Sequence, residues 1–100
     1  MPRFIIPHRD GAHNIKPTTP EVSAHVLAVS PIGGTMGGSL SVETRAPGST
    51  VFEAVQDSPI DLAAPKSLTF TFAVAEYRFT ITTKSGSASQ LAIQDTVGEL

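Results

Sequence analysis

The clearest hydrophobic pattern in the chain lies between Leu68 and Thr83, whose sequence is LTFTFAVAEYRFTITT. Apolar and polar side chains alternate through residues 68–72 and again through residues 77–82. Because successive side chains of a β-strand point to opposite faces of a sheet, this alternation predicts two strands joined by a short connection. Four of the six aromatic residues lie in these strands, so we expect the fold to be organised around them.

Shorter stretches with turn residues between them predict the remaining strands. They are residues 21–29, a hairpin of residues 40–45 and 50–56, a short edge strand at 60–62, and a last strand that contains Leu91 and Ile93. Seven strands spaced roughly ten residues apart are typical of an all-β domain, here a small antiparallel β-sandwich of the jelly-roll or immunoglobulin-like kind, or a barrel. We expect one β-sandwich domain over residues 21–95 and a frayed C-terminus over residues 96–100.

The inward faces of these strands define a small expected core. Residues 21–29 carry apolar side chains on both faces, and we assign Val22 and Val26 to the core. In residues 50–56 we expect Phe52 to point inward. The full expected set is Val22, Val26, Leu40, Val42, Phe52, Leu68, Phe70, Phe72, Tyr77, Phe79, Ile81, Leu91 and Ile93. Such a core is thin for 100 residues, and small domains often gain stability by association.

Residues 1–20 predict an extended N-terminal arm, because four prolines interrupt them and proline removes a backbone donor and favours extended geometry. The arm is either a loose terminus or a segment that docks on a neighbouring subunit. Its contacts would be its large apolar side chains, which are Phe4, Ile5, Ile6 and Ile15. Residues 30–39 contain two Gly-Gly pairs and predict a loop, mobile or held from outside the monomer, whose Ile32 and Met36 would form a second contact.

Composition narrows the classes of partner. The net charge of −2 gives no basic surface for a nucleic acid. No apolar run approaches the roughly 20 residues that span a bilayer, and the N-terminus does not resemble a signal peptide. The chain has no cysteine, so disulfides and cysteine-based zinc sites are excluded.

No catalytic constellation stands out in the sequence. There is no G-x-S-x-G motif and no glycine-rich phosphate loop. The histidines His8, His13 and His25 lack metal-ligand spacing, so we expect them to be solvated or hydrogen-bonded. Arg78 should form a structural ion pair with Glu43, Glu53 or Glu76, or reach a neighbour. We therefore expect neither an enzyme nor a cofactor.

The middle of the chain resembles a β-sandwich module of small tailed-bacteriophage virion proteins. The resemblance runs from residue 40 to residue 93 and rests on three short motifs, LSVET, PGSTVF and EYRFT. Members of this group include head decoration (cement) proteins and other accessory parts of heads and tails. The resemblance implies a structural role, in which copies bind the capsid or tail surface, often as homotrimers. It carries over no catalytic residue.

We therefore expect a capsid decoration protein that is assembled into the virion in the host cytoplasm. Its partners would be itself and the major capsid protein or another virion protein. Two alternatives stay open, a head–tail or tail accessory protein and a carbohydrate-binding or adhesion module. The second is disfavoured because exposed aromatic platforms are typical of glycan sites, whereas this chain has no Trp and one Tyr.

Overall fold

The computed structural model describes residues 3–16, 24–71 and 73–98, and these residues form nine β-strands and no helix. The strands are β1 (Arg3–Pro7), β2 (Gly11–Ile15), β3 (Ala24–Ile32), β4 (Gly37–Arg45), β5 (Phe52–Ala54), β6 (Ile60–Asp61), β7 (Leu68–Phe70), β8 (Glu76–Ser85) and β9 (Gln90–Gly98). All their pairings are antiparallel. The predicted all-β fold is confirmed, with nine strands in place of seven.

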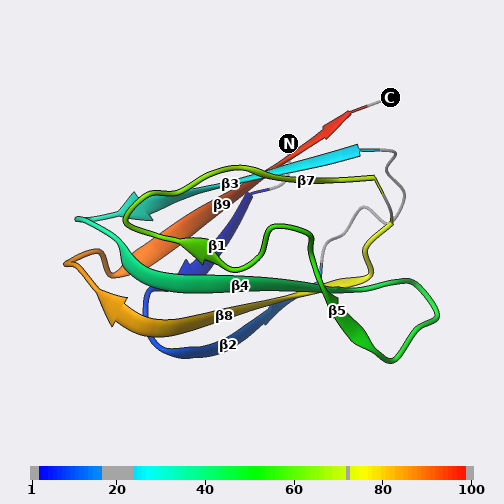
Figure 1. Ribbon diagram of the computed structural model, residues 1–100, viewed down its shortest axis with the longest axis horizontal. Helices are drawn as coiled ribbons and strands as arrows, with labels where there is room; N and C mark the ends of the chain where they lie inside the picture. Colours follow the sequence, from blue (N-terminus) through cyan, green and yellow to red (C-terminus); the bar gives the residue numbers. More distant parts are fainter. Residues whose placement is uncertain (1–2, 17–23, 72, 99–100) are drawn as a thin grey trace.

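The strands form two sheets that pack face to face as a β-sandwich, with the four-stranded sheet above the five-stranded sheet in Figure 1. The four-stranded sheet has the order β1-β9-β3-β7, and the five-stranded sheet has the order β2-β8-β4-β5 with β6 also paired to β4. The two strands of the 68–83 pattern, β7 and β8, therefore belong to different sheets. The chain between them crosses from one layer of the sandwich to the other.

The core fills the space between the sheets. Nine residues of the expected inward set are buried there, namely Leu40, Val42, Leu68, Phe70, Tyr77, Phe79, Ile81, Leu91 and Ile93. Val22 and Phe72 lie outside the described residues. Alternation thus placed the inward face correctly wherever only one face of a strand is apolar.

Two members of the expected core point outward. Val26 is 36% exposed, whereas its neighbour Leu27 is 2% exposed, so the inward phase of β3 is the opposite of the predicted one. Phe52 is half-buried on the outer side of the five-stranded sheet, where its ring lies under the guanidinium of Arg78, and Val55 takes the buried position. In both stretches apolar residues occupy both phases, so alternation alone cannot choose the face.

Residues 3–15 are part of the sandwich and do not form a separate arm. All five residues of β1 pair with residues 90–94 of β9, and all five of β2 pair with residues 77–81 of β8. These backbone pairings, together with the burial of Ile6, offset an ordering entropy that the few apolar side chains would not offset alone. Residues 17–20 of the predicted arm lie outside the described residues.

The glycine-rich stretch is shorter than predicted and is held by its own chain. β3 continues to Ile32 and β4 begins at Gly37, which leaves residues 33–36 as the loop. The amide of Ala88 donates to the carbonyl of Thr35 at 2.8 Å, and the amide of Thr35 donates to the hydroxyl of Ser87 at 3.2 Å. The C-terminal segment also differs from expectation, because β9 continues to Gly98 instead of fraying from residue 96.

Candidate functional site

The outer face of the four-stranded sheet carries almost no charge, and we call it the neutral face. Strand registry brings its members side by side: Ile5 pairs with Ala92, Ala92 with Ser30, and Val26 with both Thr69 and Thr96. The outward-facing residues are Arg3, Ile5, Pro7, Val26, Ala28, Ser30, Ile32, Thr69, Gln90, Ala92, Gln94 and Thr96. Half of them are apolar, and Arg3 is the one charged member among the described residues.

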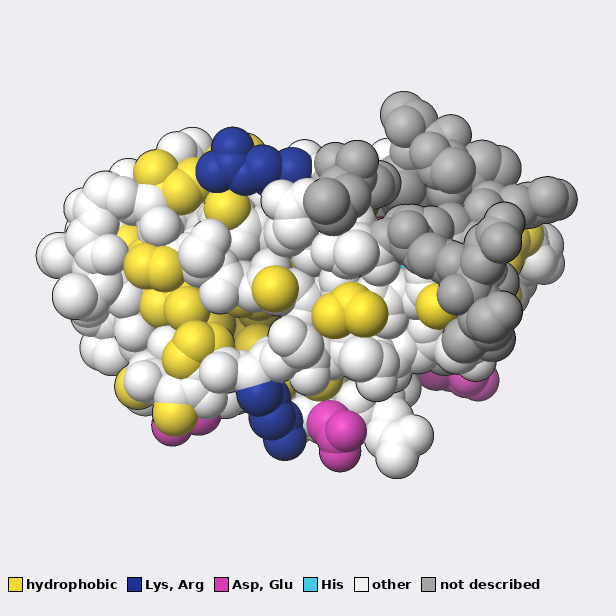
Figure 2. Space-filling model, turned by 90° about the horizontal axis from the view of Figure 1, so that it is seen from above, with side chains coloured by type: hydrophobic (Ala, Val, Ile, Leu, Met, Phe, Trp, Pro, Cys, Tyr) yellow, Lys and Arg dark blue, Asp and Glu magenta, His cyan; other side chains and the backbone are white. Residues whose placement is uncertain are grey.

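Figure 2 looks onto this side of the molecule and shows hydrophobic side chains among uncharged atoms, with Lys and Arg near two opposite margins and Asp and Glu along one of them. Ile5 and Val26 are 40% and 36% exposed, whereas Ala92, between Ile5 and Ser30, is only 3% exposed. Strands whose outer face is solvated usually alternate apolar with charged or polar residues. The neutral face departs from that pattern because its exposed positions other than Arg3 lack charge, and this makes it the candidate contact surface of the described residues.

The outer face of the five-stranded sheet has the opposite character. Registry sets Glu43 opposite Arg78 and Arg45 opposite Glu76. Nε and Nη2 of Arg78 donate to the two carboxylate oxygens of Glu43, both at 3.0 Å, and the Arg78 guanidinium lies 4.3 Å from the centroid of the Phe52 ring. The ion pair that the sequence predicted for Arg78 is therefore confirmed, with Glu43 as its partner.

These ion pairs change the acidity of the carboxyl groups. The hydrogen bond from Arg78 lowers the pKa of Glu43. Hydrogen bonds from Asn14 and then Arg45 lower the pKa of Glu76, which Nε and Nη2 of Arg45 reach at 3.2 and 3.1 Å. Every charged group in the two pairs thus has a partner within the chain, so this face offers a bound ligand no unpaired charge from these four residues.

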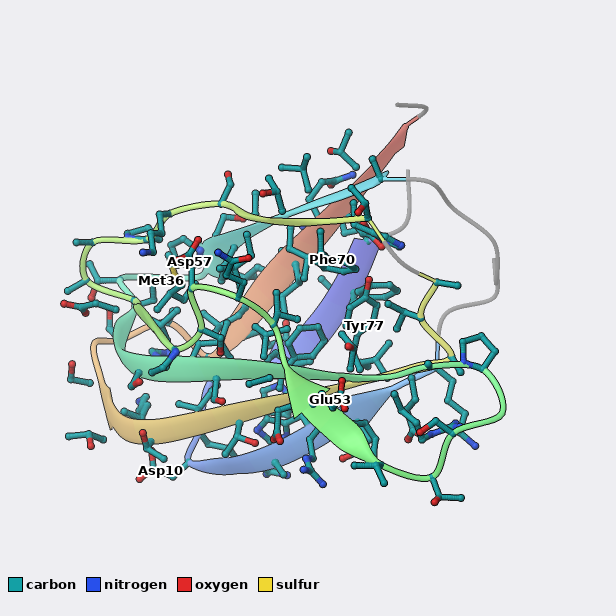
Figure 3. The ribbon with its side chains drawn as sticks, turned by 45° about the vertical axis from the view of Figure 1, so that its right-hand side comes forward. Asp10, Met36, Glu53, Asp57, Phe70 and Tyr77 are labelled. Carbon is teal, nitrogen blue, oxygen red and sulfur yellow. The ribbon has the colours of Figure 1, made fainter. Side chains whose placement is uncertain are left out.

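A cluster of three polar side chains lies buried between the sheets. Nδ1 of His25 is 3.0 Å from both carboxylate oxygens of Asp95, and the hydroxyl of Tyr77 donates to Oδ2 of Asp95 at 3.0 Å. The His25 ring stacks on Phe70 with centroids 4.5 Å apart, and Figure 3 shows Phe70 and Tyr77 together in the space between the sheets. Burial raises the pKa of Tyr77 above its usual range, and the Asp95 carboxylate raises it further.

The cluster has the residue types of a proton relay but not the access that catalysis requires. His25, Asp95 and Tyr77 are 4%, 2% and 0% exposed. Nε2 of His25 is buried and has no hydrogen-bond partner among the described residues. Because these groups are almost completely buried and hydrogen-bonded to one another, we assign the cluster a structural role that fixes β3, β8 and β9 relative to one another.

His8 is the second buried histidine, and it links the β1–β2 connection to the β8–β9 loop and to the start of β4. Its Nδ1 lies 2.8 Å from the carbonyl oxygen of Ala88, and its Nε2 lies 3.1 Å from the carbonyl oxygen of Gly37. Among the residues that the structure describes, no three His, Asp or Glu side chains gather as metal ligands would. The expectation of solvated or hydrogen-bonded histidines is confirmed for His8 and His25 and also for His13, whose Nε2 lies 3.2 Å from the carbonyl oxygen of Arg9.

The residues predicted to bind partners separate into two groups. Ile5 and Ile32 lie on the neutral face, on strands that flank β9. Ile6 is buried in the chain's own core, and Phe4, Ile15 and Met36 pack against that core. Sequence reasoning missed Val26, Ala28 and Ala92, although residues 24–32 and 90–94 contain no Lys, Arg, Asp or Glu, and that absence could have pointed to this face.

Comparison with known protein families, with curated proteins and with solved structures finds no match for this chain. Within the described ranges there is no helix of the length and apolarity that crossing a membrane requires.

Proposed function

We propose that the chain is a structural protein of a bacteriophage virion, a capsid decoration (cement) protein whose copies bind the assembled shell and one another. The observation that carries the proposal is the contrast between the two outer faces, one with two internal ion pairs and one nearly free of charge. A protein that acts by contact needs such a face, whereas an enzyme needs accessible reactive groups. The resemblance of residues 40–93 to phage virion modules supports a phage virion as the place where the protein acts.

The mechanism follows from mass action. A protein that binds only the assembled shell lowers the free energy of that state, by about 2.7 kcal/mol per site when its free concentration is a hundred times the dissociation constant. Where copies bind one another, apolar side chains of the neutral face would leave water, which supplies the driving force for that contact. No covalent step and no cofactor are required.

Mass spectrometry of purified phage particles from the source of this sequence tests the proposal directly. We expect the chain among the virion proteins, at a copy number comparable to that of the capsid subunits. Particles stripped of it should open at lower temperature, and purified chain should restore their stability. A chain that is absent from the particles would exclude the function, and density at the tail would favour the tail accessory alternative.

The carbohydrate-binding alternative has less support from the geometry. A surface hollow of about 300 Å³ lies beside β5, and its lining residues are Thr44, Ala46, Ser49, Val51, Glu53 and Ala54. None of them is aromatic, and the ring of Phe52 is occupied by Arg78. A glycan array should show no binding, and a reproducible hit would favour this alternative over a decoration protein.

A further inference from the structure

We infer that the neutral face of one copy packs against the neutral face of a second copy, as a dimer with two-fold symmetry. The inference rests on the proposed function, and it adds to that function the partner of the neutral face. It concerns the isolated chain, so it can be tested without a phage particle.

Charge selects the partner among the chain's own surfaces. Packing the neutral face against the five-stranded sheet of a second copy would remove Arg78, Glu43 and their neighbours from water without supplying new partners for them. Desolvation of ion pairs is costly, and their mutual attraction already exists in the free chain. Two neutral faces bring only Arg3 of each copy, at the edge strand β1. Packing two neutral faces together therefore removes no ion pair from water.

The shape of the face also suits a second sheet. The central strands β9 and β3 carry small side chains at the middle of the face, with Ala92 beside Ser30 and Ala28 two positions along β3, and Ala92 is itself only 3% exposed. Larger apolar side chains, Ile5 and Ile32, lie on either side of β9. Stacked sheets pack about 10 Å apart with interdigitated side chains, and a low centre flanked by larger side chains allows that approach.

The area of the face sets the strength of the contact. The four strands have 5, 9, 9 and 3 residues, and at about 3.3 Å per residue and about 4.8 Å between strands they give a face of roughly 400 Å² per copy and roughly 800 Å² for the pair. Stable complexes usually bury about 1,200–2,000 Å², so this dimer belongs to the weak class. We expect monomers at micromolar concentration and dimers as the concentration approaches millimolar. Where copies are concentrated on a surface, we expect most of them to be dimeric.

Sedimentation equilibrium of the purified chain from about 10 μM to about 1 mM tests the inference. The apparent mass should rise from monomer toward dimer, and the association should not weaken when salt rises from 50 to 500 mM, because no ion pair forms. Ala28→Lys should weaken the association at least tenfold. Thr82→Lys, an exposed position on the outer face of the five-stranded sheet, is the matched control and should leave it unchanged.

Concentration-dependent NMR shifts provide a second measurement that does not depend on a variant folding. Shifts that change along β3 and β9 support the inference. Changes confined to β4 and β8, a chain that stays monomeric at 1 mM, or equal effects of the two lysine variants would each overturn it. A monomeric chain that is nevertheless found in virions would exclude the dimer and keep the proposed function, and a dimer absent from virions would do the reverse.

Discussion

Replacing Tyr77 by Phe should change how the stability of the chain depends on alkaline pH. Tyr77 is fully buried and donates a 3.0 Å hydrogen bond to the Asp95 carboxylate. Removing a hydrogen bond to a charged group costs about 1.5–3 kcal/mol. Near pH 8 the Phe variant should therefore be less stable than the native chain by about that amount.

The stability difference between the native chain and the Phe variant reverses sign at high pH, because burial raises the pKa of Tyr77 in the folded chain. In the unfolded chain tyrosine loses its proton near pH 10. The stability contributed by the protonated hydroxyl is fully present below that pH and is lost above it by about 1.4 kcal/mol per pH unit. By pH 12 the loss reaches about 2.7 kcal/mol, so the stability curves of the native chain and the Phe variant should meet between roughly pH 11 and 12.

The assay is urea unfolding at a series of pH values, combined with tyrosinate absorbance. Tyr77 is the only tyrosine and there is no tryptophan, so the absorbance change reports this one hydroxyl. Lysine titration is common to both chains and cancels in the difference. A reversible tyrosine titration near pH 10 in the folded chain, or a stability difference that stays constant up to pH 12, would refute the reasoning.

Three further predictions concern the backbone, the core and the charged face. Gly38→Ala should destabilise the fold by about 1–3 kcal/mol more than Gly48→Ala, although both glycines have positive φ. A Cβ at Gly38 would lie 2.9 Å from two backbone carbonyl oxygens of β8, whereas Gly48 faces open space. Chemical denaturation of the two variants compares their stabilities, and equal losses would contradict the prediction. Leu27→Ala should lower the free energy of unfolding by about 2–5 kcal/mol, and Val26→Ala should lower it much less. Thermal melts of the two variants check the order, and the opposite order would mean that Val26, not Leu27, points into the core. Glu43→Gln should reduce the loss of stability on acidification. Because the pKa of Glu43 is lowered in the folded chain, its ionised carboxylate stabilises the fold above about pH 4.5, and this stabilisation is lost as the pH falls through the pKa of the folded chain. If urea unfolding of the variant shows the same loss of stability at acid pH as the native chain, this ion pair does not contribute.

The fold class followed from the sequence because alternation is a local signal. Strands such as β8, with Tyr77, Phe79 and Ile81 on one phase and polar residues on the other, specify both their conformation and their inward face. In β3 apolar residues fill both phases, and the choice between Val26 and Leu27 depends on which sheet covers which side. That information lies in the pairing with β7 and β9, which are distant in sequence.

The candidate sites were harder to predict for the same reason. His25, Tyr77 and Asp95 come from three strands, and Asp95 lies next to a terminus that was expected to fray, so only the pairing of β9 with β3 reveals their cluster. The neutral face is likewise a property of neighbouring strands. What the sequence offered was the lack of charge in two separate segments, and only the four-stranded sheet places those segments side by side.

The pairing of β1 with β9 has a consequence for how the protein is made. Residues 3–7 leave the ribosome more than eighty residues before their partners at 90–94. Until then the early strand has no sheet edge to join, and its loop closure is among the longest in the domain, which slows folding. The sandwich is therefore completed only after β9 has been made, and a chain interrupted before β9 would expose β3 without the strand that covers its edge.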